Sequence, residues 1–161
     1  MKKTLLILFS LTAISGAFAQ TSDAEADALV NLLGVQKKEA VSKLVQVTGK
    51  DSVAFWKIYD EYLQSNKATA KTRISLYEKT ALAYRNMTPG IADSLAVKYF
   101  GIRMEQEKNL EVYYRKIKAA TNAVAAFEFY QAETYLLTMI RAQIMQQIPT
   151  YGQVQSTMKK N

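Results

Sequence analysis

The sequence contains no histidine and no cysteine, and only two prolines and six glycines among its 161 residues. Without histidine it lacks the commonest general base and the usual imidazole ligand for metal ions. Without cysteine it has no thiol nucleophile, no disulfide and no site for a lipid anchor near its N-terminus. Neither a glycine-rich phosphate-binding loop nor the spacing of a calcium loop is present. We therefore expect no enzyme activity, no cofactor and no bound metal ion.

A mechanism based on carboxylates alone would need two acidic side chains that face one pocket. The nearest candidates are Asp60 with Glu61 and Glu105 with Glu107. Residues one or two positions apart diverge on a helix, so these side chains are predicted to lie on solvated faces.

The N-terminus has the pattern of a signal peptide. Lys2 and Lys3 form a charged region, residues 4–15 form a short apolar region, and residues 17–19 read Ala-Phe-Ala. The apolar run is shorter than the roughly 20 residues that a membrane-spanning helix needs. We expect residues 1–19 to be cleaved, leaving Gln20 as the first residue of a protein that resides in the periplasm or, alternatively, is secreted.

Removal of Lys2 and Lys3 would lower the formal net charge from +7 to +5. This excess is modest and spread along the chain, so it favours acidic partners or a membrane surface only through long-range attraction. No basic block is present, and binding of nucleic acid is not expected.

The remaining chain indicates helices almost throughout, because no run of β-branched residues alternates with period two between turns. Apolar residues that recur every three or four positions predict helices over about 23–47, 49–86, 88–117 and 122–148. Thr88 and Pro89 are typical of a helix start. Glu111 and Arg115 form an i,i+4 pair. We predict one all-α domain over 20–152, an elongated or curved four-helix hairpin-type bundle without β-sheet, followed by a frayed tail over 153–161.

Aromatic residues are frequent on the predicted helix faces, and the chain contains ten tyrosines. Their spacing favours core positions, although tyrosine-rich faces also occur in grooves that bind unfolded chains or a partner helix. The predicted core aromatics are Phe55, Tyr59, Tyr62, Tyr77, Tyr84, Tyr99, Tyr113 and Phe127.

A possible partner surface lies beside these faces. Trp56 lies about 100° around the helix from Phe55, and Tyr114 cannot share a face with Tyr113. Lysines on the 49–86 helix would add a positive field. The candidate surface comprises Trp56, Lys57, Lys67, Lys71 and Tyr114.

Two helix starts share a pattern in which a hydroxyl residue is followed by an aromatic. In the first, Val47, Thr48 and Asp51 precede Phe55, and Thr48 with Asp51 suggests a capping box. In the second, residues 119–123 precede Phe127. This arrangement resembles the LTxxQ motif of the Spy/CpxP-like group of small exported helical proteins, with valine in place of leucine and aspartate in place of glutamine.

The resemblance implies a curved all-helical protein of the periplasm, often dimeric, that binds unfolded clients without ATP or contacts a membrane sensor of envelope stress. Metal-binding members of the group use histidine, which this chain lacks. We expect an ATP-independent chaperone or envelope-stress adaptor whose partner is an unfolded or membrane protein, with a homodimer possible and no membrane-spanning segment after cleavage. The alternative is a dedicated regulator of one membrane sensor or other envelope partner, without general chaperone activity.

Overall fold

The computed structural model describes residues 23–148 and 150–158, and the predicted signal peptide lies outside these ranges. The described residues form helices and no strands, which confirms the predicted all-α class. In chain order they are α1 (Asp23–Leu44), α2 (Gly49–Ser65), α3 (Lys67–Ala83), the 3₁₀ turn η1 (Tyr84–Asn86), α4 (Pro89–Ala120), α5 (Ala123–Gln147) and α6 (Tyr151–Met158). None of the described helices combines the length and apolar character needed to cross a bilayer.

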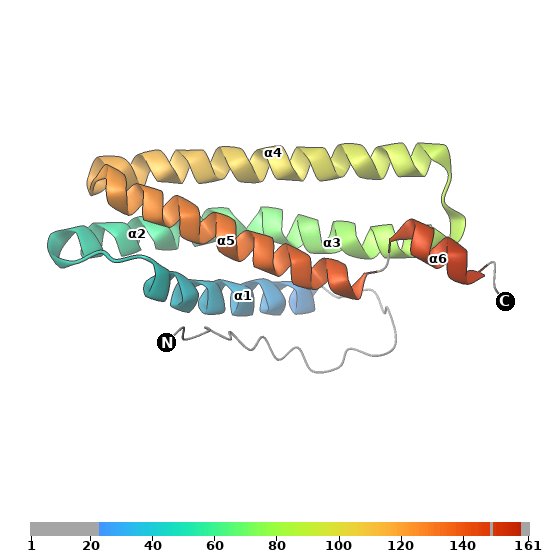
Figure 1. The fold of residues 1–161 in the computed structure, drawn as a ribbon, viewed down its shortest axis with the longest axis horizontal. Coiled ribbons are helices and arrows are strands. Elements are labelled where there is room, and N and C mark those ends of the chain that lie inside the picture. Colours follow the sequence, from blue (N-terminus) through green and yellow to red (C-terminus); the bar gives the residue numbers. More distant parts are fainter. Residues whose placement is uncertain (1–22, 149, 159–161) are drawn as a thin grey trace, which may run out of the picture.

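The helices form an elongated bundle (Figure 1). The α2 and α3 helices run end to end as one long rod, and α4 returns along the whole length of this rod. The α5 helix turns back from the end of α4 and crosses the bundle, while α1 packs against α3 and α5. Successive long segments therefore alternate in direction, as hairpins with short connections require.

Local chemistry fixes the starts of α4 and α5. The Thr88 hydroxyl accepts a hydrogen bond from the Ile91 amide at 3.2 Å, and Pro89 occupies the first helical turn as predicted. The Asn122 side chain accepts hydrogen bonds from the amides of Val124 at 2.9 Å and Ala125 at 3.0 Å. These caps satisfy amides that have no partner within the helix.

The predicted helix over 49–86 is interrupted at Asn66. Its backbone stays helical, with φ −84° and ψ −10°, but its side-chain amide donates to the Tyr62 carbonyl at 2.9 Å. Asn109 of α4 donates to the Asn66 side-chain oxygen at 3.0 Å. Asparagine readily forms such local bonds in place of regular helical ones, so the irregularity is confined to one residue.

The hydrophobic core is concentrated at the end of the bundle where α1 leads into α2 and α4 into α5. It comprises Ala40, Val41, Val45, Phe55, Tyr59, Tyr62, Leu110, Tyr113, Ile117, Ala126, Phe129, Ala132 and Leu136. Small alanines on α5 permit close approach of the neighbouring helices. The predictions for Phe55, Tyr59, Tyr62 and Tyr113 are confirmed.

Beyond Asn66 the face of α3 that packs against α4 is polar. The Thr69 hydroxyl donates to Glu105 at 2.9 Å, Arg73 donates to Gln106 at 2.5 Å, and the hydroxyls of Thr80 and Tyr99 lie 2.8 Å apart. The prediction that Tyr77, Tyr84 and Tyr99 are core residues is therefore wrong, since all three are only half-buried. The Tyr77 and Tyr99 rings still lie 5.8 Å apart across this interface, but the three hydrogen bonds also join its helices, and hydrophobic periodicity does not detect those.

Phe127 was also predicted in the core, and this prediction is wrong. Its side chain is 52% exposed, whereas Phe129 is completely buried. The buried stripe of α5 follows Ala125, Ala126, Phe129 and Glu133, so it runs through alanines and one carboxylate. The predicted frayed tail differs as well, because α6 extends through Met158 and the Tyr151 ring lies 5.7 Å from that of Tyr84.

Candidate functional site

The helix-start motif is arranged differently from a capping box. Thr48 precedes α2, but its side chain makes no capping hydrogen bond. The next residue, Gly49, has φ +58°, a left-handed conformation that glycine adopts without a steric penalty. Asp51 instead accepts a hydrogen bond from Asn122 at 3.1 Å, which ties the start of α2 to the start of α5. Val47 is half-buried against the core.

The aromatic side chains that begin α2 form a packed cluster with α5. Phe55 and Tyr59 stack at a ring distance of 6.1 Å, and Phe129 packs edge-on against Phe55, Tyr59 and Tyr62 at 5.2 to 6.5 Å. These rings are fully or almost fully buried. Their function is to hold α2 against α5, so they offer no surface to a partner.

A buried carboxylate lies at the centre of this cluster. Glu133 of α5 is fully buried and accepts hydrogen bonds from the hydroxyls of Tyr59 at 2.8 Å and Tyr62 at 2.7 Å. Its second oxygen also pairs with the ammonium of Lys37 in α1 at 2.7 Å. Three helices thus meet at one carboxylate whose polar atoms are well satisfied. We call Glu133, Tyr59, Tyr62 and Lys37 the Glu133 network.

Burial raises the pKa of Tyr59 and Tyr62 above the ordinary value of 10.0, and the negative charge of Glu133 raises it further. Both hydroxyls consequently remain donors at every pH at which the protein is folded in ordinary buffers. Sequence reasoning missed this network. The available signal was an acidic residue in the middle of the most apolar helix, four positions after Phe129.

The predicted carboxylate pairs do not converge on one pocket. The Asp60 carboxylate lies 2.5 Å from Lys38, and the Glu61 carboxylate lies 3.6 Å from Lys116. Glu105 accepts from Thr69 of α3, while Glu107 is exposed on α4.

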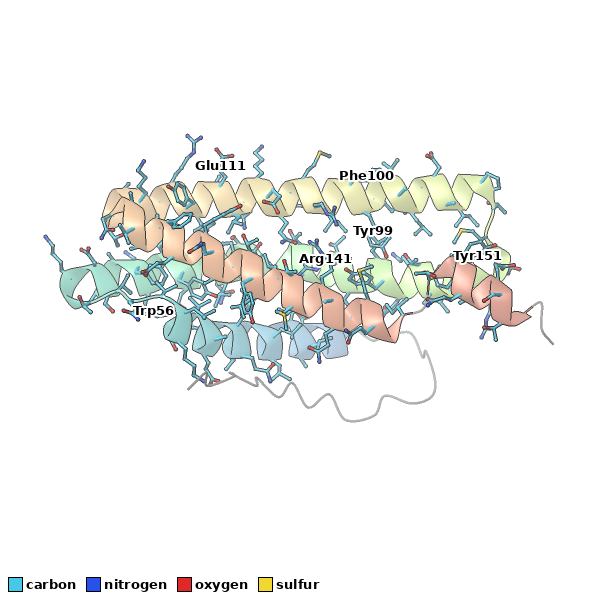
Figure 2. All side chains as sticks on the ribbon, viewed as in Figure 1. Trp56, Tyr99, Phe100, Glu111, Arg141 and Tyr151 are labelled. Atoms are coloured by element: carbon cyan, nitrogen blue, oxygen red, sulfur yellow. The ribbon has the colours of Figure 1, made fainter. Side chains whose placement is uncertain are left out.

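The residues predicted as a partner surface are distributed over different parts of the bundle. Trp56 is half-buried, packs edge-on against Phe55 at 5.0 Å and has the Lys38 ammonium 5.8 Å from its ring centre. It therefore faces α1, on the opposite side of the bundle from Glu111 of α4 (Figure 2). Lys57 is exposed, and Lys67 is half-buried.

Lys67 lines a cavity of about 320 Å³ between α1, the α2–α3 junction and α5, together with Lys37, Lys38 and Arg73. Lys71 pairs with Asp27 of α1. Lys67 and Lys71 thus lie beside α1, and none of the three predicted lysines is among the residues that line the groove around Tyr114.

Tyr114 lies in a groove between α4 and α5. It is half-buried and shares the groove with Leu110 on its own helix and with Phe127 and Tyr130 on α5. Charged residues of both signs, Glu107, Lys108 and Glu111, line the α4 side. We call this depression the α4–α5 groove.

The exposed side of α5 is unusually apolar for a surface helix. Five large apolar side chains lie opposite its buried stripe and are between 52% and 69% exposed: Val124, Phe127, Tyr135, Met139 and Met145. We call these five residues the outer face of α5. Phe127 belongs both to this face and to the α4–α5 groove, so the two surfaces are continuous.

Charges are almost absent from this helix. Its 25 residues contain three charged side chains, compared with ten in the 32 residues of α4. Glu133 is buried, and Glu128 accepts a hydrogen bond from the backbone amide of Gln46 at 2.9 Å. Arg141 lines a cavity between its own helix, α3 and α4. The exposed polar residues among the five apolar side chains are uncharged: Gln131, Thr134 and Thr138. A surface helix normally carries a charged face, whereas an exposed face rich in large apolar side chains marks a site of interaction.

Comparison with protein-family models, with characterised proteins and with solved structures found no match to this chain.

Proposed function

We propose that this protein binds polypeptide partners on the outer face of α5 and in the adjoining α4–α5 groove, as an ATP-independent chaperone or envelope-stress adaptor of the periplasm. The observation that carries the proposal is the uncharged outer face of α5, where five large apolar side chains are more than half exposed. Burying such side chains against a client releases about 25 cal/mol for each Å² of apolar surface.

The kinds of side chain on this face favour varied clients over one tightly fitted partner. Met139 and Met145 are flexible and polarisable, so they adapt to apolar surfaces of different shape. Tyr135 and Phe127 add broad rings that contact apolar segments with little loss of conformational freedom. The positive net charge of the chain would increase the rate of encounter with acidic clients.

The second candidate is a regulator that binds one membrane sensor or other envelope partner. The observation in its favour is the α4 side of the groove, where Glu107, Lys108 and Glu111 present charges of both signs. A fixed pattern of opposite charges selects the orientation and identity of a partner.

Aggregation of two unrelated denatured enzymes, measured by light scattering without ATP, distinguishes the two functions. Residues 20–161 are expected to suppress aggregation of both enzymes. A Phe127→Ser, Tyr135→Ser variant is expected to lose most of this activity, and Tyr114→Ala to lose part of it. Absence of suppression at several-fold molar excess would contradict the chaperone function and leave the single-partner regulator.

A matched control removes exposed apolar side chains from other helices. Leu32 of α1 and Val53 of α2 are 53% and 76% exposed, so a Leu32→Ser, Val53→Ser variant loses comparable apolar surface. This control is expected to retain full suppression. Light scattering coupled to size exclusion tests a homodimer: a change from dimer to monomer in the Phe127→Ser, Tyr135→Ser variant would show that a second copy occupies the outer face of α5.

A further inference from the structure

A second cavity lies at the end of the bundle away from the core. It measures about 350 Å³, is partly open to solvent and is lined mainly by residues of α3, α4 and α5. Its walls include Tyr77, Tyr99, Ile102 and Met145. This volume is within the range of sites that bind small molecules, which are typically apolar with a few polar groups.

Three arginines from three different helices line this cavity: Arg73 of α3, Arg103 of α4 and Arg141 of α5. None of the residues that line it is acidic. The salt bridges formed within the described part of the chain involve none of these three arginines. In Figure 2, Arg141 and Tyr99 lie in the same region between α4 and α5.

The charge of Arg73 is poorly compensated. This half-buried side chain donates to the neutral Gln106 amide oxygen at 2.5 Å. Burial lowers the pKa of Arg73, and the nearby positive charge of Arg141 lowers it further. Arg73 and Arg141 line the same cavity, so two positive charges face one largely apolar space without an acidic residue among its lining. An anion between them would offset both the repulsion and the loss of hydration.

We propose that this cavity binds a small amphipathic anion, with a carboxylate held by Arg141 and Arg73 and an apolar body against the aromatic wall. Guanidinium groups suit this function, because they remain charged when partly buried and bind carboxylates through two parallel hydrogen bonds. Tyr99 directs its hydroxyl to Thr80, which leaves its ring to face the apolar body. Met145 borders both this cavity and the outer face of α5, but the arginines and the aromatic wall belong to neither that face nor the α4–α5 groove. The inference therefore does not depend on the proposed polypeptide site.

Decanoate is a suitable probe, because a cavity of this size accommodates on the order of ten non-hydrogen atoms at roughly 30 Å³ each. Isothermal titration calorimetry of residues 20–161, which retain every described helix, is expected to show saturable binding of one decanoate. Decanol lacks the charge and acetate lacks the apolar body, so both are expected to bind at least about tenfold more weakly.

The variant Arg141→Gln is expected to weaken decanoate binding about tenfold or more, through the loss of charge-assisted hydrogen bonds. Arg115→Gln is the matched control: it removes the same charge from an exposed arginine that pairs with Glu111 on the outside of α4, and it is expected to bind normally. Arg73→Gln, at the other arginine proposed to hold the carboxylate, provides a second variant should Arg141→Gln fail to fold by circular dichroism.

Equal affinities for decanoate and decanol would overturn the proposal. Unchanged binding by folded Arg141→Gln or Arg73→Gln, or no binding to the unsubstituted protein at 1 mM decanoate, would overturn it as well. Loss of decanoate binding in the Phe127→Ser, Tyr135→Ser variant, with Arg141→Gln unaffected, would overturn it too, because the ligand would then occupy the outer face of α5.

Discussion

The Glu133 network allows a sharp test of what holds the bundle together. Replacement of Glu133 by glutamine keeps the volume of the side chain and removes its charge. The amide oxygen can still accept from one tyrosine hydroxyl. The Lys37 side chain, however, is only 10% exposed, and its ammonium would lose its carboxylate partner. Removing one partner of a buried ion pair costs about 3–5 kcal/mol.

A loss of this size is a large part of the 5–15 kcal/mol that typically stabilises a domain. Urea unfolding followed by far-UV circular dichroism is expected to show a lower midpoint with an unchanged dependence on urea concentration. Glu111→Gln provides the control, because Glu111 forms an exposed pair with Arg115 and is expected to cost less than about 1 kcal/mol.

The pairing itself can be isolated with Lys37→Met. This substitution leaves the Glu133 carboxylate with its two tyrosine donors. The double variant Glu133→Gln, Lys37→Met should lose less unfolding free energy than the sum of the losses in the two single variants. We expect a coupling energy of about 1–3 kcal/mol. A loss below about 1 kcal/mol for Glu133→Gln, or strictly additive effects, would refute the reasoning that this carboxylate is buried and ionised.

Three further predictions concern the same core and its caps. The two tyrosines of the network stay protonated in the folded state, because burial and then Glu133 raise their pKa, while in the unfolded chain they ionise near pH 10. The free energy of unfolding should therefore fall above about pH 10, by up to ~1.4 kcal/mol per pH unit for each tyrosine. Urea unfolding measured between about pH 9 and 11 would contradict this prediction if the free energy did not fall. Phe129→Ala should lower the free energy of unfolding by about 3–5 kcal/mol, whereas Phe127→Ala should change it by less than about 0.5 kcal/mol. Similar thermal midpoints for the two variants would show that the assignment of the buried face of α5 is wrong. Asn122→Ala should lower the free energy of unfolding by about 1 kcal/mol, because two backbone amides lose their cap, whereas Thr48→Ala should lower it by only about a few tenths of a kcal/mol. If urea unfolding gave the reverse order, Thr48 would be the residue that caps α2.

Much of the fold could be predicted from local sequence signals. The start of α4 follows from Thr88 and Pro89, whose conformational preferences act on their own backbone. The burial of Phe55, Tyr59 and Tyr62 follows from their spacing on an otherwise polar helix, where only one face can enter the core.

The errors arose where local signals were ambiguous or where distant residues decide. Both Phe127 and Phe129 lie on a helix that is apolar on both sides, so periodicity could not show which face is buried. Glu133 is held in the core by hydroxyls more than 70 residues away in the sequence, a pairing that periodicity does not encode. Thr48 has the residue type of a capping side chain but makes no capping hydrogen bond, and the residue after it has a left-handed backbone that the capping pattern does not predict.

In the sequence, the only sign of the exposed apolar face of α5 was the small number of charged residues in this helix. It became a candidate site once the fold showed that no described helix covers its outer side. Trp56 is a weaker candidate in the folded structure, because its ring contacts the core from the side of α1.

The measurement that tests the central claim most directly is methyl NMR on methionine-labelled protein. Met139 and Met145 report on the outer face of α5, and half-buried Met87, between η1 and α4, serves as an internal control. On addition of a permanently unfolded polypeptide, such as reduced and carboxymethylated lactalbumin, we expect the Met139 and Met145 signals to shift or broaden while that of Met87 stays unchanged. Unchanged Met139 and Met145 signals at saturating polypeptide would contradict the claim that this face binds partners.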